Sequence, residues 1–139
     1  MAGTIVLGYD ASPGAERALD IAIELASQFG DRLVIGFGAA PPGPPTEDYR
    51  EHRRALEEMG ERATAVALSR ARAAGLDAEV ELVPKRPSMA LSELADREEA
   101  RMIVVGSYGE SPMKGAILGS TPHKLLHWAE RPVLVVPAG

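Results

Sequence analysis

The sequence predicts an α/β fold built on a five-stranded parallel sheet with helices on both faces. Short apolar runs rich in β-branched residues alternate along the chain with segments in which apolar residues recur every three or four positions. This alternation of strand and helix predicts parallel strands joined by right-handed crossovers. The chain has 139 residues, of which 45% are hydrophobic, and this suits one domain, 1–139, with a core of its own.

The first half of the chain begins with a strand, a helix and a second strand. Thr4 to Tyr9 is a short apolar run, and the helix after it is expected to be capped by Ser12 and to stop at Gly30. Arg32 to Phe37 forms the second strand. Residues 39–45 then include four prolines, which fix φ and remove hydrogen-bond donors, so this segment is expected to be a stiff surface loop.

A long helix is expected from Glu47 to Ala74, with Gly75 as its stop. Gly60 should weaken the middle of this helix, because glycine loses more conformational freedom in a helix than any other residue. The residues expected on its inward face are Leu56, Met59, Ala63, Val66, Ala67 and Arg70.

The second half of the chain repeats the alternation. Ala78 to Val83 alternates apolar and acidic side chains, which predicts a strand at the edge of the sheet. Met102 to Gly106 is apolar without alternation, as in a strand covered on both faces, so we place it at the centre. The remaining elements are a helix from about Ser88 with Leu91, Leu94 and Ala95 inward, a helix containing Leu125, Leu126 and Trp128, and a closing strand from Pro132 to Val136.

The composition excludes several classes of protein. The chain has 15 basic and 20 acidic side chains, a net charge of −5 and 4% aromatic residues, which argues against nucleic-acid binding. It contains no cysteine, which excludes disulfides, thiolate nucleophiles and cysteine metal sites. No basic leader segment and no apolar stretch of membrane-spanning length occurs, so we expect a cytoplasmic protein without a membrane partner.

Two strand ends carry residues with binding chemistry. In an open parallel sheet, ligands bind outside the carboxyl ends of the strands, where the strand order reverses. Asp10 places a carboxylate directly after the first strand, where a role in a turn or cap is equally open. Twelve residues follow Gly106 before Gly119, and a connection of this length is too long to be only a turn.

That connection is bounded by the pattern Gly-x2-Gly-x9-Gly-Ser, formed by Gly106, Gly109, Gly119 and Ser120. Glycines let backbone N–H groups approach an anion, and the helix expected after Ser120 directs the positive end of its dipole to the same place. The pattern is neither a Rossmann fingerprint nor a Walker loop. It therefore predicts a phosphate site of another kind, with a flexible loop before a capped helix as the alternative.

Several segments resemble the universal stress protein family. The run Ile5 to Ser12 followed by Glu16 to Leu19 is similar to the first strand and helix of that family, and the segment from Val104 to Val136 is similar to its most diagnostic part. The resemblance covers nearly the whole chain. It implies the strand order 3-2-1-4-5 of adenine-nucleotide alpha-hydrolase-like folds and membership of the ATP-binding branch.

The resemblance also implies which residues hold ATP, accompanied by Mg²⁺. Asp10 would bind the ribose or the adenine edge, and the backbone of Phe37 would meet the base. Two departures from the family pattern are Gly8, where larger residues often stand, and Pro122, which removes an amide but fits the first helical turn if Thr121 is the cap. The residues that would contact phosphates are Gly106, Gly109, Gly119, Ser120 and Thr121.

The function that the resemblance implies is that of a nucleotide-dependent stress sensor or regulator, in which bound nucleotide shifts the loop conformation and thereby the protein partner that is met. The alternative is an interaction module of the same fold that binds no nucleotide and acts through dimerisation alone. We expect no enzyme, because Glu110 is the only carboxylate in the glycine-rich loop and rapid phosphoryl transfer needs a positioned water and a held metal.

A homodimer is expected through the strand Pro132 to Val136, because an exposed apolar edge strand needs a partner and a second copy can pair with it. His123 and His127 share one helical face and form a possible metal pair, but no third ligand follows at a defined spacing, so no metal site is predicted. Lys114 could reach a phosphate or be solvated. Lys85 and Arg86 are assigned to the surface.

Overall fold

A computed structural model describes residues 2–107 and 118–138 of the chain. It confirms the α/β fold, with five parallel strands in the order β3-β2-β1-β4-β5. The strands are β1 (Thr4–Gly8), β2 (Arg32–Gly38), β3 (Ala78–Val83), β4 (Met102–Gly106) and β5 (Val133–Val136). The helices are α1 (Pro13–Phe29), α2 (Tyr49–Ala73), α3 (Pro87–Arg97) and α4 (Ser120–Trp128).

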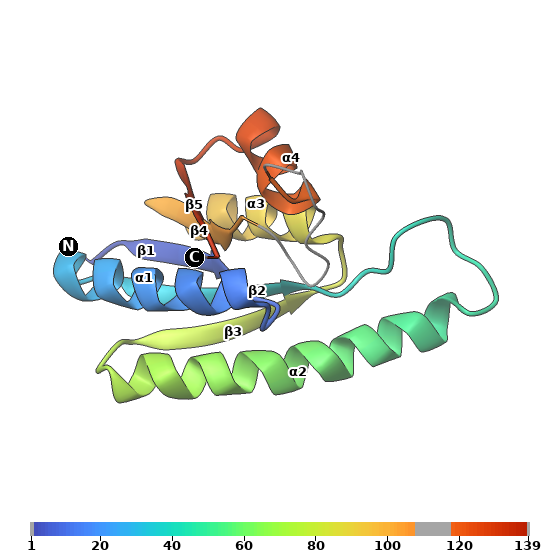
Figure 1. Cartoon of the computed structure of the whole chain (residues 1–139), viewed down its shortest axis with the longest axis horizontal. Helices are drawn as coiled ribbons and strands as arrows, with labels where there is room; N and C mark the ends of the chain where they lie inside the picture. Colours follow the sequence, from blue (N-terminus) through green and yellow to red (C-terminus); the bar gives the residue numbers. More distant parts are fainter. Residues whose placement is uncertain (1, 108–117, 139) are drawn as a thin grey trace.

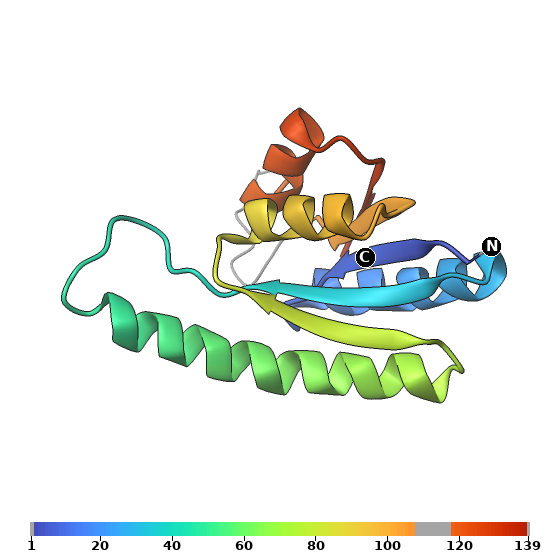
Figure 2. The same cartoon turned by 180° about the vertical axis from the view of Figure 1, so that it is seen from behind.

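The helices cover both faces of the sheet. α1 and α2 lie on one face, and α3 and α4 lie on the other (Figure 1). Seen from behind, the segment between β2 and α2 projects away from the sheet as a long loop (Figure 2). No helix in the described ranges is both long enough and apolar enough for a membrane span.

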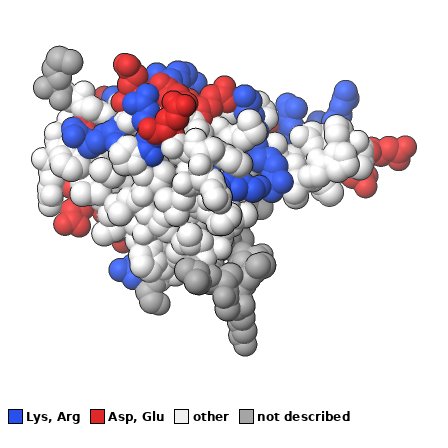
Figure 3. Space-filling model, turned by 90° about the horizontal axis from the view of Figure 1, so that it is seen from above, with Lys and Arg blue, Asp and Glu red and all other residues white. Residues whose placement is uncertain are grey.

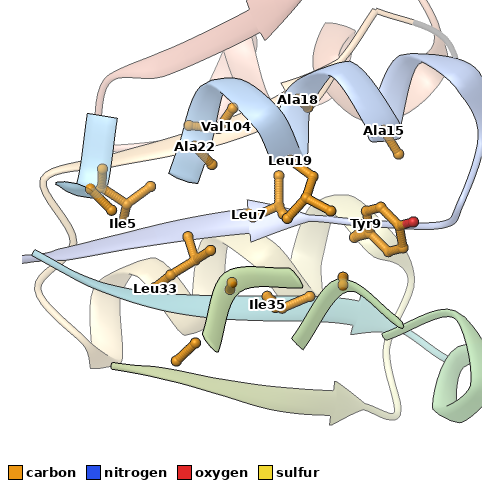
Figure 4. Packing of buried hydrophobic residues seen from close by; sticks show 14 of the residues in the cluster. Ile5, Leu7, Tyr9, Ala15, Ala18, Leu19, Ala22, Leu33, Ile35 and Val104 are labelled. Carbon is orange, nitrogen blue, oxygen red and sulfur yellow. The ribbon is translucent and has the colours of Figure 1, made fainter. Parts of the chain in front are cut away.

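The alternation of side chains along the strands divides the core in two. Ile5 and Leu7 of β1 are fully buried on the α1 side, where Leu19 packs with them (Figure 4). Val6, between them, belongs to the opposite cluster with Leu94 of α3. Because both faces are covered, a central strand such as β1 is apolar at consecutive positions. The prediction that Met102–Gly106 is central and Ala78–Val83 is an edge strand is confirmed.

The predicted inward face of α2 is partly wrong. Met59 and Val66 are 42% and 57% exposed, and the buried stripe is displaced to Gly60, Thr64, Ala67 and Ala71. Small residues form this stripe because the helix lies close to the sheet. A Cβ atom at Gly60 would lie 2.5 Å from a ring carbon of Phe37, so Gly60 makes room for that ring.

An ion pair ties the amino ends of three strands together. Asp31, just before β2, has a fully buried carboxylate that accepts hydrogen bonds from the Arg101 guanidinium at 2.6 and 3.1 Å and from the Gly3 N–H at 2.8 Å. Arg101 precedes β4 and Gly3 precedes β1. The hydrogen bond from Arg101 is the largest influence on the carboxyl group and holds the pKa of Asp31 below its ordinary value.

Replacing Asp31 by asparagine is expected to remove a pH-dependent part of the stability. Because the pKa of Asp31 is lowered on folding, the stabilisation is present above the ordinary carboxyl pKa and is lost as the pH falls through the lowered value. Thermal unfolding between about pH 6 and pH 2 should show the wild type more stable at pH 6, with the difference from Asp31→Asn shrinking toward low pH. A difference that stays constant over this range would contradict the assignment.

Candidate functional site

A cleft of about 500 Å³ opens where β1, β2 and β4 end. This edge includes the place where the strand order reverses between β1 and β4. The volume is within the range of small-molecule sites. Of the predicted site residues, Gly109 lies outside the described residues, and the others all line the cleft: Asp10, Phe37, Gly106, Gly119, Ser120 and Thr121.

Asp10 is held by the turn that joins β1 to α1. Its Oδ1 accepts a hydrogen bond of 3.0 Å from the N–H of Ser12, and Ala11 adopts a left-handed conformation with φ of 65°. The Ser12 hydroxyl in turn accepts a hydrogen bond of 3.2 Å from the N–H of Ala15. Ser12 therefore caps α1, as predicted. The turn role left open for Asp10 is therefore confirmed, and the same carboxylate lines the cleft.

The backbone of β2 presents a peptide group at the cleft. The carbonyl of Gly36 accepts a hydrogen bond from the N–H of Tyr9, so Gly36 faces the β1 side. The N–H of Ala39 donates a hydrogen bond to the carbonyl of Val83, so Ala39 faces the β3 side. Since successive residues of a strand face opposite neighbours, the N–H and C=O of Gly38 face the β1 side, beyond the point where β1 ends. By the same alternation the peptide groups of Phe37 face β3.

Gly106 is required by packing as well as by its place in the motif. A Cβ atom there would lie 2.6 and 2.8 Å from the carbonyl carbon and oxygen of Gly14 and 2.9 Å from the nitrogen of Ala15. The first turn of α1 therefore rests directly on the end of β4. Gly8, one departure from the family pattern, has an equally close neighbour, since a Cβ atom would lie 2.6 Å from a methyl carbon of Leu91.

The start of α4 differs from the prediction. The helix begins at Ser120 and its N-cap is Gly119, so Thr121 is not the cap and Pro122 is the third helical residue. The reason is that Gly119 has an extended backbone, with φ of −69° and ψ of 171°, and its carbonyl accepts the first helical hydrogen bond from the N–H of His123 at 3.1 Å. Ser120 and Thr121 thus occupy the first helical turn, where N–H groups lack acceptors within the helix.

The phenol of Tyr9 is tied to α1 and α2. Its hydroxyl donates to the Glu16 carboxylate, which also lies 2.7 Å from the guanidinium of Arg70. Burial first, and then the hydrogen bond to Glu16, raises the pKa of Tyr9 well above its ordinary value. The phenol therefore stays protonated in neutral solution.

The cleft is also lined by residues that the sequence did not assign to it, among them Leu56, Met59 and Arg86. Leu56 and Met59 were expected in the core face of α2, and Arg86 was expected on the surface. The available signal for Arg86 was its position three residues after the end of β3, because the carboxyl ends of parallel strands share one edge of a sheet.

The histidine pair lies on the surface of α4. His123 and His127 are exposed, with their rings edge to face and their centres 4.9 Å apart. Within the described ranges, no three His, Asp or Glu side chains gather as a metal site would require. The face seen from above carries basic and acidic side chains intermixed, without a broad basic patch (Figure 3).

Comparison with known proteins gives a consistent result. The family model described as "Universal stress protein family" matches residues 1–137. A universal stress protein of Thermus aquaticus is 34% identical over 135 residues, covering 96% of this chain and 97% of the relative. A universal stress protein of Mycolicibacterium smegmatis is 34% identical over 138 residues, covering 95% of this chain, but the chain spans only 45% of that relative.

Among solved structures, the crystal structure of a universal stress protein in complex with cAMP contains a chain whose sequence is 31% identical to this one. Its TM-score is 0.72, and the match covers 99% of this chain and 98% of that one.

Proposed function

The chain belongs to the universal stress protein family, and from this premise we propose that it binds an adenine nucleotide, ATP in the first place, in the cleft at the ends of β1, β2 and β4. The bound nucleotide would make it a cytoplasmic regulator of a stress response. The observation that supports this most is that all the described residues assigned from the family resemblance line one cleft at the switch point of the sheet. The cAMP complex of a 31% identical relative also supports it.

Each part of the nucleotide has a candidate partner. The Asp10 carboxylate can accept hydrogen bonds from the ribose hydroxyls, and the N–H and C=O of Gly38 can pair with the base edge in place of the Phe37 backbone. Ser120 and Thr121 can donate to phosphate from the first turn of α4. Asp10 is the only carboxylate among the described lining residues, and it is assigned to the ribose. Mg²⁺ would therefore be held mainly by the phosphates of ATP and would bind together with the nucleotide.

The proposal is tested on the wild-type protein. Mass spectrometry of small molecules released by denaturation should detect an adenine nucleotide. Calorimetry on nucleotide-free protein should then show binding of ATP with Mg²⁺, with ADP, AMP and cAMP compared alongside. If nothing is released and none of the four binds up to millimolar concentration, the alternative of a dimeric interaction module that binds no nucleotide replaces this proposal.

Gly119→Val is expected to weaken nucleotide binding without unfolding the protein. The backbone of Gly119, with φ of −69° and ψ of 171°, is a conformation that valine also adopts. A branched side chain at this N-cap would hold a phosphate away from Ser120 and Thr121. Loss of one charge-assisted hydrogen bond should weaken ATP binding by about tenfold or more, measured by calorimetry. An unchanged affinity would remove Gly119 from the phosphate site.

We also propose that nucleotide occupancy, rather than turnover, is the signal. Asp10 is the one carboxylate among the described lining residues, and this proposal assigns it to the ribose hydroxyls rather than to a water at the phosphates. Backbone amides stabilise the bound ground state and the transition state nearly alike, which tightens binding without accelerating chemistry.

A homodimer through β5 remains our proposal for assembly. β5 is an edge strand of the sheet. The carbonyls of Pro132 and Val136 face β4, because they accept hydrogen bonds from the N–H groups of Ile103 and Ser107. By alternation, the N–H groups of Val133 and Val135 face outward, where a second copy could pair with them.

Val135→Pro is expected to convert the dimer to a monomer, because it removes one outward N–H group and spares the ladder with β4. Light scattering at tens of micromolar measures the mass. A monomeric wild type, or a variant that stays dimeric and folded, would contradict pairing through this strand.

A further inference from the structure

The wall that α2 contributes to the cleft is apolar. Leu56 and Met59 line the cleft from this helix, and Phe37 lines it from β2. The two elements touch here, since a Cβ atom at Gly60 would lie 2.5 Å from a ring carbon of Phe37. Met59 directly precedes Gly60, so it lies at the end of the cleft formed by the last residues of β2, where the base is proposed to bind.

Solvent reaches Met59 inside this cleft. The side chain is 42% exposed, and a cleft of about 500 Å³ admits small solutes. A thioether carries no charge and needs no deprotonation before it reacts with a peroxide, so its oxidation follows its access to solvent. Met59 is therefore open to oxidation as long as no ligand covers it.

The other sulfur atoms of the chain supply the contrast. The sequence contains no cysteine, so methionine holds all of the sulfur. Met89 of α3 is 55% exposed and does not line the cleft, whereas Met102 of β4 is half-buried. Met1 and Met113 lie outside the described residues. Of the methionines that the structure describes, Met59 is thus the one that is both exposed and part of the cleft.

We propose that Met59 is a reversible oxidation site, at which hydrogen peroxide converts the thioether to a sulfoxide and thereby lowers the affinity of the cleft for its nucleotide. This rests on the proposed nucleotide binding. A lone pair of the sulfur attacks one oxygen of the peroxide, the O–O bond breaks, an S–O bond forms and water leaves. The sulfur is oxidised and the peroxide is reduced, so no further reactant is needed.

The sulfoxide changes the contact with the base. The reduced side chain is flexible and apolar, and it packs well against an aromatic ring. The sulfoxide oxygen is a hydrogen-bond acceptor, and neither the face of a base nor the side chains of Leu56 and Phe37 offer it a donor. Covering this oxygen without a partner is unfavourable and should weaken binding by about tenfold. Bound nucleotide in turn covers the sulfur and should slow its oxidation.

The test measures ATP binding by calorimetry before and after mild peroxide treatment, and mass spectrometry of peptides identifies the oxidised residues. The wild type should lose about tenfold in affinity, and methionine sulfoxide reductases acting on both epimers should restore it. Met89→Leu should lose as much, because it keeps Met59. Met59→Leu, which keeps the other methionines, should show the same affinity before and after treatment. Saturating ATP should slow the oxidation of Met59 but not that of Met89.

A second variant at the same position needs no oxidant. Met59→Gln places a polar group at a similar reach and should bind ATP about tenfold more weakly than Met59→Leu. Circular dichroism of each protein, before and after treatment, checks that the fold is intact.

The possible failures are distinguishable. If the untreated wild type binds no adenine nucleotide, the proposed nucleotide binding fails and this inference falls with it. If the wild type binds ATP and treated Met59→Leu loses as much affinity as the treated wild type, the sensitive residue is another one, and only the role of Met59 is overturned. An unchanged affinity in wild type that carries the sulfoxide at Met59, or equal affinities of Met59→Gln and Met59→Leu, would overturn that role as well.

Discussion

Gly106→Ala is expected to lower the free energy of unfolding by about 1–3 kcal/mol, the usual range for overpacking a closely packed site. The new Cβ atom would lie within 2.9 Å of three backbone atoms of Gly14 and Ala15. A backbone cannot rotate away as a side chain does, so the first turn of α1 would have to move off β4. Urea denaturation followed by far-ultraviolet circular dichroism measures the loss.

Gly8→Ala is the matched control, because it stands at the end of the neighbouring strand β1. Its closest obstacle is the far end of the Leu91 side chain, at 2.6 Å, and that side chain can adjust. The loss should therefore be smaller than for Gly106→Ala. If Gly106→Ala is as stable as the wild type, the close contact between α1 and β4 is not what requires glycine at this position.

Asp10→Asn is expected to weaken binding of ATP, AMP and adenosine alike by about tenfold to a hundredfold. The carboxylate offers charged acceptors to the ribose hydroxyls, whereas asparagine offers one neutral acceptor. Asparagine keeps an oxygen for the N–H of Ser12, so the turn into α1 should survive.

Calorimetry with 2′,3′-dideoxyadenosine provides the control for Asp10. The wild type should prefer adenosine to this analogue, and the preference should disappear in Asp10→Asn, because both ribose hydroxyls are missing from the analogue. If the preference persists in the variant, Asp10 does not contact the ribose and acts only through its turn.

The sequence alone predicted the order of the elements, the parallel sheet and several of the residues that line the cleft at its carboxyl edge. The periodicity of Thr4 to Tyr9, the cap at Ser12 and the stop at Gly30 are local signals, formed by residues that are neighbours along the chain. The place of Asp10 after the first strand was equally readable, because every carboxyl end of a parallel strand lies at one edge.

Only the tertiary structure decided which residues meet across that edge. The inward stripe of α2 was displaced because Gly60 admits the ring of Phe37, which lies more than twenty positions earlier in the chain. Arg86 lines the cleft because the backbone of residues 85–87 packs on Gly38. Gly106 is fixed by the first turn of α1. Close approaches between distant segments depend on how the helices pack on the sheet, and no periodicity along one segment carries that information.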